Sequence, residues 1–152
     1  MLINLCCGGH VWDGWLCLDP RTHVDPRIIA WKWGQRIPVD DSTVDGILVS
    51  YGWLYAPKEK YPEHLTECWR VLKPGGVLVI KEDDDRLRVW RQIGTKHKTG
   101  LIRSTSNEPE MKALMEAAGF QVEATYPLEF EEALDTHRMA RGKSYVLTGR
   151  KA

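Results

Sequence analysis

The first 19 residues combine residue types that could bind a nucleoside. The apolar run 2–5 leads into Cys6-Cys7-Gly8-Gly9, and a second apolar run ends at Asp19. Glycines directly after a strand let the backbone approach a ligand closely, and a carboxylate at the end of the next strand can accept hydrogen bonds from both ribose hydroxyls. Because glycine turns after strands are common, this pattern alone is a moderate indication of a nucleoside site.

A run of four acids, Glu82-Asp83-Asp84-Asp85, follows the apolar stretch 77–80. Carboxylates gathered at a strand end could bind a metal ion or act as a base toward a substrate. Solvated charges at the end of a strand are the simpler explanation. Asp83 is the first of the four to test as a base, because its place at the rim of the expected sheet favours it.

Cys6, Cys7, His10 and Cys17 could suggest zinc, but their spacing matches no usual structural zinc site. We therefore predict no metal, and thiols that pack at strand ends. A nucleophilic cysteine is equally disfavoured, since the sequence assigns no base partner to any of these thiols.

Six Lys or Arg residues and no acid lie in the stretch 86–107, together with Trp90. This stretch could be a basic lid or insert over an anionic or nucleic-acid substrate. It could equally be a loop whose charges balance the acids before it. Both interpretations stay open at this point.

The elements that must position these residues alternate between short apolar strands and helices with apolar residues three or four positions apart. This alternation predicts an α/β domain with a largely parallel sheet, and ligands bind such sheets beyond the carboxyl ends of the strands. The expected strands are 2–5, 15–18, 28–31, 44–50, 77–80, 120–126 and 144–148, and the expected helices are 61–72, the stretch from the cap Asn107 to Gly119, and a short helix within 128–142. The first helix is expected to stop at Lys73-Pro74-Gly75-Gly76.

Composition limits the function classes. A chain of 152 residues suits one domain, and 21 basic and 21 acidic residues give zero net charge, so no global attraction to nucleic acid or membrane is expected. No apolar run approaches the roughly 18–20 residues of a membrane span, and the first residues lack the features of a secretion signal. Four cysteines without a disulfide-framework spacing favour reduced thiols and a cytoplasmic location.

Three segments resemble, in order, the motifs of class I S-adenosylmethionine-dependent methyltransferases. Asn4-Leu5-Cys6-Cys7-Gly8-Gly9 with Gly14-Trp15 and Asp19 resembles the first motif, and residues 37–45 resemble the second. Arg70-Val71-Leu72-Lys73-Pro74-Gly75-Gly76 matches the third almost letter for letter. The resemblance implies a single minimal domain (1–152), with a reduced Rossmann-like sheet that is mostly parallel, an antiparallel C-terminal strand, and S-adenosylmethionine as cofactor.

The resemblance also implies roles for residues at matching positions. Gly8 would line the methionine part of the cofactor and Asp19 would bind its ribose. Trp33 and Gly34 stand where the family often has an acid that reads adenine, and Trp33 could stack on the ring instead. Ser50 and Tyr51 would lie beside the sulfonium, which Tyr51, Trp53 and Tyr55 could attract by cation–π contact unless they simply pack against the next helix. The cofactor-binding residues implied in this way are Asn4, Cys6, Cys7, Gly8, Gly9, Asp19, Trp33, Gly34, Ser50 and Tyr51.

The chain departs from the family pattern in ways that carry further expectations. Cys6 replaces a glycine and could crowd the cofactor. The connections after the first two strands are too short for full helices, since a parallel crossover usually needs about a dozen residues. One sheet face would then be bare and need a partner, so we predict a homodimer or a larger complex with Trp12, Trp15 and Trp31 as contributors.

The expected reaction is transfer of a methyl group to an O or N nucleophile of an unidentified acceptor, helped mainly by positioning and water exclusion. Asp83 and Tyr55 are the candidate bases. Nucleic acid is a conceivable acceptor that no motif favours. Two alternatives remain: a cofactor-binding protein without transfer activity, and a subunit that depends on a partner.

Overall fold

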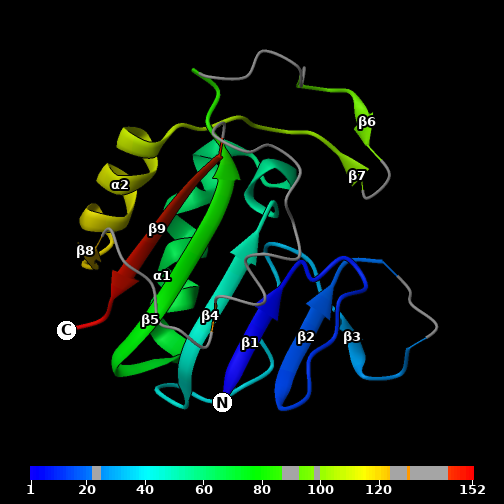
Figure 1. Ribbon diagram of the computed structural model, residues 1–152, viewed down its shortest axis with the longest axis vertical. Helices are drawn as coiled ribbons and strands as arrows, with labels where there is room; N and C mark the ends of the chain where they lie inside the picture. The colour runs from blue at the N-terminus through cyan, green and yellow to red at the C-terminus, as the bar shows by residue number, and fades with distance from the viewer. Residues whose placement is uncertain (22–24, 87–92, 98–99, 124–129, 131–143) are drawn as a thin grey trace.

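A seven-stranded sheet organises the chain, with strand order β3-β2-β1-β4-β5-β9-β8 (Figure 1). The computed structural model describes residues 1–21, 25–86, 93–97, 100–123, 130 and 144–152. All neighbouring strands are parallel except where β9 runs antiparallel to β5 and β8. The strands of this sheet are β1 (Leu2–Leu5), β2 (Trp15–Asp19), β3 (Ile28–Ala30), β4 (Val44–Ser50), β5 (Leu72–Asp83), β8 (Gln121–Glu123) and β9 (Ser144–Arg150). The predicted sheet, with its antiparallel C-terminal strand, is confirmed.

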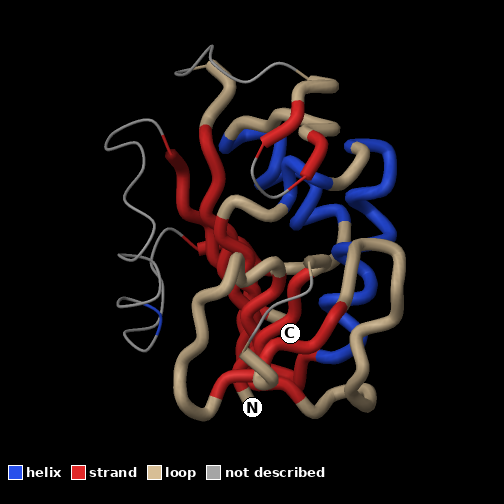
Figure 2. Tube along the Cα trace, turned by 90° about the vertical axis from the view of Figure 1, so that its right-hand side faces the viewer, coloured by secondary structure: helices blue, strands red, loops and turns tan. Residues whose placement is uncertain are grey.

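Two α-helices, α1 (Tyr61–Val71) and α2 (Glu108–Ala117), cover one face of the sheet (Figure 2). Leu65 of α1 and Met111 of α2 are fully buried in the same cluster as Ile3 and Ile47 of the central strands. The ends of α2 follow the sequence expectation: the Asn107 side chain accepts a hydrogen bond from the Glu110 amide at 3.1 Å. No described helix has the length and apolar character that a membrane span requires.

The opposite face carries no helix among the described residues, as the short connections predicted (Figure 2). It is nevertheless not bare. Leu48 and Val79 on this face are completely buried in the single chain. Trp15 lies edge-on to Phe130, with ring centroids 5.3 Å apart, and Trp12 lies against Trp15. The expectation of an exposed apolar face was therefore wrong, because the aromatic side chains of Trp12, Trp15 and Phe130 pack against it.

Two features differ from the sequence expectation. The first helix stops before the glycine-rich stretch, as expected, but β5 begins at Leu72 instead of residue 77 and includes that stretch, where Gly75 donates to the Lys151 carbonyl and Lys151 donates to the Gly76 carbonyl. A short hairpin, β6 (Lys96–His97) and β7 (Gly100–Leu101), was not predicted. The helix expected within 128–142 lies, apart from residue 130, outside the described residues. Residues 124–126 of the expected strand 120–126 also lie outside them.

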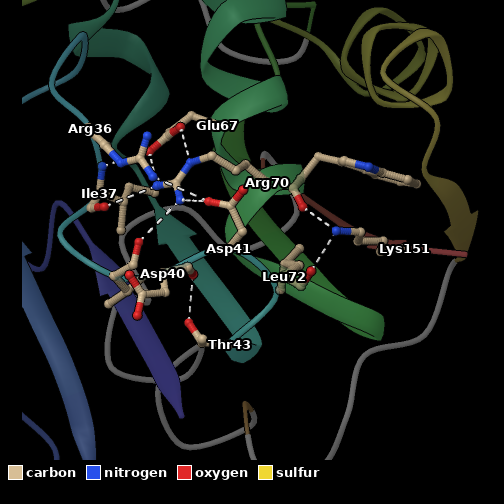
Figure 3. A network of polar contacts seen from close by, with 11 residues as sticks. Arg36, Ile37, Asp40, Asp41, Thr43, Glu67, Arg70, Leu72 and Lys151 are labelled. Atoms are coloured by element: carbon tan, nitrogen blue, oxygen red, sulfur yellow. Dashed lines mark hydrogen bonds and ion pairs between the residues drawn. The ribbon is translucent and has the colours of Figure 1, made fainter.

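A polar network joins the segment between β3 and β4 to α1 (Figure 3). Arg70 of α1 donates to the carbonyl oxygens of Ile37 and Val39 at 3.1 and 3.2 Å, and the Ile37 amide donates to Glu67 at 2.8 Å. Glu67 and Asp41 both pair with Arg70, and these two acids raise the pKa of its guanidinium. The second and third motifs of the sequence therefore touch each other, and their physical role is to fasten the 36–41 segment to α1.

Candidate functional site

Four parallel strands end at the same edge of the sheet, and the predicted site residues follow them directly (Figure 1). The loop 6–9 follows β1, Asp19 ends β2, Ser50 ends β4 and Asp83 ends β5. We call this edge the rim. The topology therefore brings together residues that are up to 77 positions apart in the chain.

Asp19 and Gly8 are joined by a hydrogen bond at the rim. The Gly8 amide donates to one carboxylate oxygen of Asp19 at 2.7 Å, and Asp19 is only 3% exposed. The other carboxylate oxygen accepts from the amide and from Nε of Arg21, both at 3.1 Å. Gly8 has a φ of +62°, a conformation that glycine adopts without strain. The glycine turn and the carboxylate thus form one unit.

Cys6 does not crowd the glycine turn. Its side chain packs toward β4, where a Cβ added to Gly52 would lie 2.8 Å from the Cβ of Cys6 and 3.1 Å from its sulfur. Gly52 thus provides the space for this side chain. Burial raises the pKa of the Cys6 thiol well above its usual range, so the thiol stays protonated and is a poor nucleophile.

The neighbouring thiols are structural. Cys7 and Cys17 are at most 1% exposed and both are free. A hydrogen bond between the two thiols raises the pKa of Cys7 and lowers that of Cys17 to about 7. The described residues contain no cluster of three His, Cys, Asp or Glu side chains able to hold a metal ion. Asn4 is also buried, at 2% exposed.

Trp33 joins the segment after β3 to the turn after β4. Its indole N–H donates to the Gly52 carbonyl at 3.0 Å, and its ring lies 4.7 Å from that of Trp53 and 4.8 Å from that of His64. Trp33, Gly34 and His64 line a cavity of about 290 Å³ beside α1. Burial lowers the pKa of His64, so this ring stays neutral at pH 7.

Tyr51 begins a second polar group at the rim. Its φ of +54° is unusual for a bulky side chain, and backbone strain of this kind gathers at functional sites. The Tyr51 hydroxyl lies 2.7 Å from Oγ of Ser144, which donates to Asp83 at 3.5 Å. The Lys81 ammonium lies 5.8 Å from the centre of the Tyr51 ring. Sequence reasoning missed Ser144 and Lys81. The register opposing Asp83 to Ser144 would have found the first.

Two other members of the acidic run, Glu82 and Asp84, are not solvated, contrary to the simpler expectation. Glu82 and Asp84 are 3% and 1% exposed. Asp84 pairs with Arg86 and accepts from the Glu108 amide at the start of α2, and the hydrogen bond from Arg86 lowers its pKa. These two acids are therefore structural, which leaves Asp83 as the acid of the run that contacts Tyr51's partner Ser144.

Of the remaining predicted residues, some pack in the core and others lie outside the described residues. Trp53 is fully buried against Tyr61, so it belongs to the core. Tyr55 is the last residue of the short 3-10 helix η1 (Trp53–Tyr55). A second 3-10 helix, η2 (Lys58–Lys60), lies between η1 and α1. Within the basic stretch, Arg86 and residues 93–97 and 100–107 are described, while Arg88, Trp90, Arg91 and Lys98 lie outside the described residues.

Comparison with known proteins agrees with this fold. Residues 29–80, which are 52 of the 152, match the family model of a methyltransferase domain. No curated protein matches the chain.

Solved structures share the architecture at low sequence identity. An S-adenosylmethionine-dependent methyltransferase of Mesorhizobium loti has a TM-score of 0.64 and 13% identity, over 99% of this chain and 90% of that one. The 1,6-didemethyltoxoflavin-N1-methyltransferase of Burkholderia thailandensis, solved with its substrate and S-adenosylhomocysteine, has a TM-score of 0.62 and 18% identity, over 99% and 70%. A methyltransferase of Thermotoga maritima has a TM-score of 0.55 and 18% identity over 82% of this chain, which spans 64% of that protein.

The sheet order and the rim define a Rossmann-like methyltransferase fold. Residues 29–80 match the model of a methyltransferase domain, and the chain shares its fold with S-adenosylmethionine-dependent methyltransferases, which agrees with the class that the motifs predicted. S-adenosylmethionine is the cofactor of this class.

The residues at the rim fit that cofactor. A glycine turn in the left-handed conformation leaves its backbone open to a ligand, and a carboxylate is held beside it by the Gly8 amide. The Cys6 side chain is turned away from this unit into the space at Gly52.

Proposed function

We propose that this chain transfers a methyl group from S-adenosylmethionine to an O or N nucleophile of an acceptor bound at the rim. The observation that carries the proposal is the Asp19–Gly8 unit, which offers a ribose acceptor and an open backbone at adjoining strand ends. When bound, the cofactor supplies an electrophilic methyl group on a sulfonium.

The cofactor half of the rim consists, in this proposal, of the turn 6–9, Asp19, Trp33 and Gly34. Gly8 and Gly9 line the methionine part, and Asp19 binds the ribose. Trp33 forms a wall for the adenine, because its ring is fixed by Trp53, His64 and the Gly52 carbonyl. Asn4, Cys6 and Cys7 support the turn from beneath.

The acceptor half consists of Ser50, Tyr51 and Asp83, with Ser144 added. The Tyr51 hydroxyl, Ser144 and Asp83 form a hydrogen-bonded row that ends on a carboxylate. Asp83 accepts the proton that leaves the acceptor's nucleophile, either directly or through this row. Tyr55 is the second candidate for this role.

The proposal is tested by incubating the purified chain with S-adenosylmethionine carrying a tritiated methyl group and separate fractions of small molecules, nucleic acids and proteins. With wild type, tritium is expected to enter one of these fractions. With Asp83→Asn, it should enter the same fraction at a lower rate. Product methylated on carbon or sulfur would contradict the O or N assignment. Cofactor binding without transfer to any fraction would favour the alternative of a cofactor-binding protein.

A homodimer and a cytoplasmic location stay predictions. The covered sheet face removes the original reason for a dimer, and Trp31 is only 4% exposed and thus unavailable to a partner. Half-buried Trp12 and Trp15 remain as a contact surface. Sedimentation equilibrium would detect a dimer, and Trp12→Ser would be expected to weaken it.

A further inference from the structure

We propose that Arg21 competes with the cofactor's ribose for Asp19 and thereby limits cofactor affinity. Arg21 was not among the residues that the motifs pointed to. The inference rests on the proposed role of Asp19 as the ribose acceptor, and it concerns the affinity with which Asp19 binds the ribose.

The argument begins with the capacity of a carboxylate, which offers about four lone-pair positions for hydrogen bonds. At least three donors already use Asp19: the Gly8 amide at 2.7 Å, and the amide and Nε of Arg21 at 3.1 Å each. The two hydroxyls of a ribose need two positions, and at most one is left. At least one present donor must leave when a ribose binds.

The Arg21 side chain is the donor that can leave most easily. The Gly8 and Arg21 amides are held by the backbone, and the turn that carries Gly8 is fixed where the Cys7 amide donates to the Leu18 carbonyl at 3.1 Å. The Arg21 side chain is 34% exposed, whereas the Asp19 side chain is 4% exposed. A Cβ placed on Gly8 would lie 3.7 Å from the Arg21 guanidinium, so this group also lies over the glycine turn.

Among the described residues, the same local contact occurs at two further acids. Arg27 donates through its amide and Nε to Asp25, and Arg86 does the same to Asp84. An acid followed two positions later by arginine thus forms this contact from local geometry alone. Of these three acids, Asp19 is the one that also accepts from the glycine turn at the rim, and there the local contact competes with the proposed ligand.

The consequence is a specific pattern of affinities. A nucleoside with one hydroxyl needs one position on Asp19, so it competes with Arg21 less than a nucleoside that needs two. A nucleoside with the 2′,3′-diol gains two hydrogen bonds but must replace the one from Arg21. Removing Arg21 should therefore favour the diol more than its 2′-deoxy counterpart. It should also slow the dissociation of the product, because S-adenosylhomocysteine carries the same ribose.

The test is calorimetric titration of S-adenosylhomocysteine and its 2′-deoxy counterpart into wild type, Arg21→Gln and Arg27→Gln. Arg21→Gln is expected to bind S-adenosylhomocysteine about tenfold more tightly, as the loss of one competing charge-assisted hydrogen bond implies. The 2′-deoxy compound should gain less than about twofold, and Arg27→Gln should match wild type for both ligands. A thermal melt of each variant shows that it is folded.

Two results separate this inference from the proposed function. Unchanged or weaker S-adenosylhomocysteine binding by folded Arg21→Gln, with wild type binding normally, overturns the competition while leaving the proposed function intact. Binding by Asp19→Asn equal to wild type overturns the ribose role of Asp19, and the competition fails with it.

Discussion

The two halves of the rim are built in different ways. The cofactor half rests on residues close in sequence, since the Gly8 amide reaches Asp19 only 11 positions away. The acceptor half joins Tyr51 to Ser144 across 93 positions and Ser144 to Asp83 across 61. The cofactor half combines backbone, one carboxylate and the Trp33 ring, whereas the acceptor half is a row of hydrogen-bonded side chains. The difference suggests that the cofactor half can be read from local motifs, while the acceptor half depends on how the last strand is placed.

The largest effect is expected for a substitution of Gly8 in the cofactor half. Gly8→Val forces a branched side chain into a φ of +62° and disturbs the amide that meets Asp19, so S-adenosylhomocysteine affinity should fall more than a hundredfold. Gly75→Val is the control, because Gly75 also has a positive φ, of +80°, but lies away from the rim. Equal losses of affinity in the two variants, measured by calorimetry, would mean that Gly8 acts only through stability.

The second largest effect is expected at Arg70, which holds the segment next to Trp33 and Gly34, and it should appear as a loss of protein stability. Arg70 is 17% exposed in its side chain and holds the 36–41 segment through two carbonyls and two acids. Arg70→Met should lower the free energy of unfolding by about 2–3 kcal/mol, because the half-buried Glu67 loses its partner and two carbonyl groups lose their donor. Arg36→Met, at a side chain 69% exposed, should cost less than about 0.5 kcal/mol. Urea denaturation of both variants makes the comparison, and similar midpoints would contradict the clamp.

The acceptor half should respond in rate and not in cofactor binding. Asp83→Asn is expected to slow methyl transfer about tenfold, while S-adenosylhomocysteine affinity stays within about twofold of wild type. Asp85→Asn is the control, because its carboxylate accepts from Asn107 at 3.2 Å instead of from Ser144. A large loss of cofactor affinity in Asp83→Asn would erase the proposed division between the halves.

The smallest expected effect is a pH dependence from His64. Burial lowers its pKa, so the unfolded chain binds a proton more readily than the folded one. Its contribution to stability is therefore complete above the unfolded value of about 6.5 and is lost as the pH falls below it. His64→Gln should flatten the fall in unfolding free energy between about pH 6.5 and 5 by less than about 1 kcal/mol. Parallel curves for variant and wild type would show that His64 does not titrate in this range.

Much of the fold could be predicted because its signals are local. The Asn107 cap indicated the start of α2, and continuous apolar runs located β1, β4 and the middle of β5. Proline and the glycines at 74–76 correctly indicated the end of α1, but the early start of β5 could not be predicted, because it depends on pairing with the distant Lys151. Burial of Glu82 and Asp84 was likewise invisible, since it depends on packing against distant elements such as α2.

The site shows the same limit. Asp19 and the glycine turn could be predicted from their spacing, and they do meet at the rim. Arg21 was overlooked although it stands two residues from Asp19, because its importance arises only when the donors to one carboxylate are counted in space. Ser144 could not be found before the register of β9 against β5 was known.

The most direct test of the central claim is calorimetric titration of S-adenosylmethionine and S-adenosylhomocysteine into wild type, Asp19→Ala and Asp45→Ala. Asp45 is a half-exposed acid at the start of β4, away from the rim, and serves as the matched control. Wild type and Asp45→Ala should bind one equivalent of each ligand per chain with similar affinity, whereas folded Asp19→Ala should lose binding by at least about a hundredfold. Wild-type affinity in folded Asp19→Ala would contradict the cofactor site proposed at this rim.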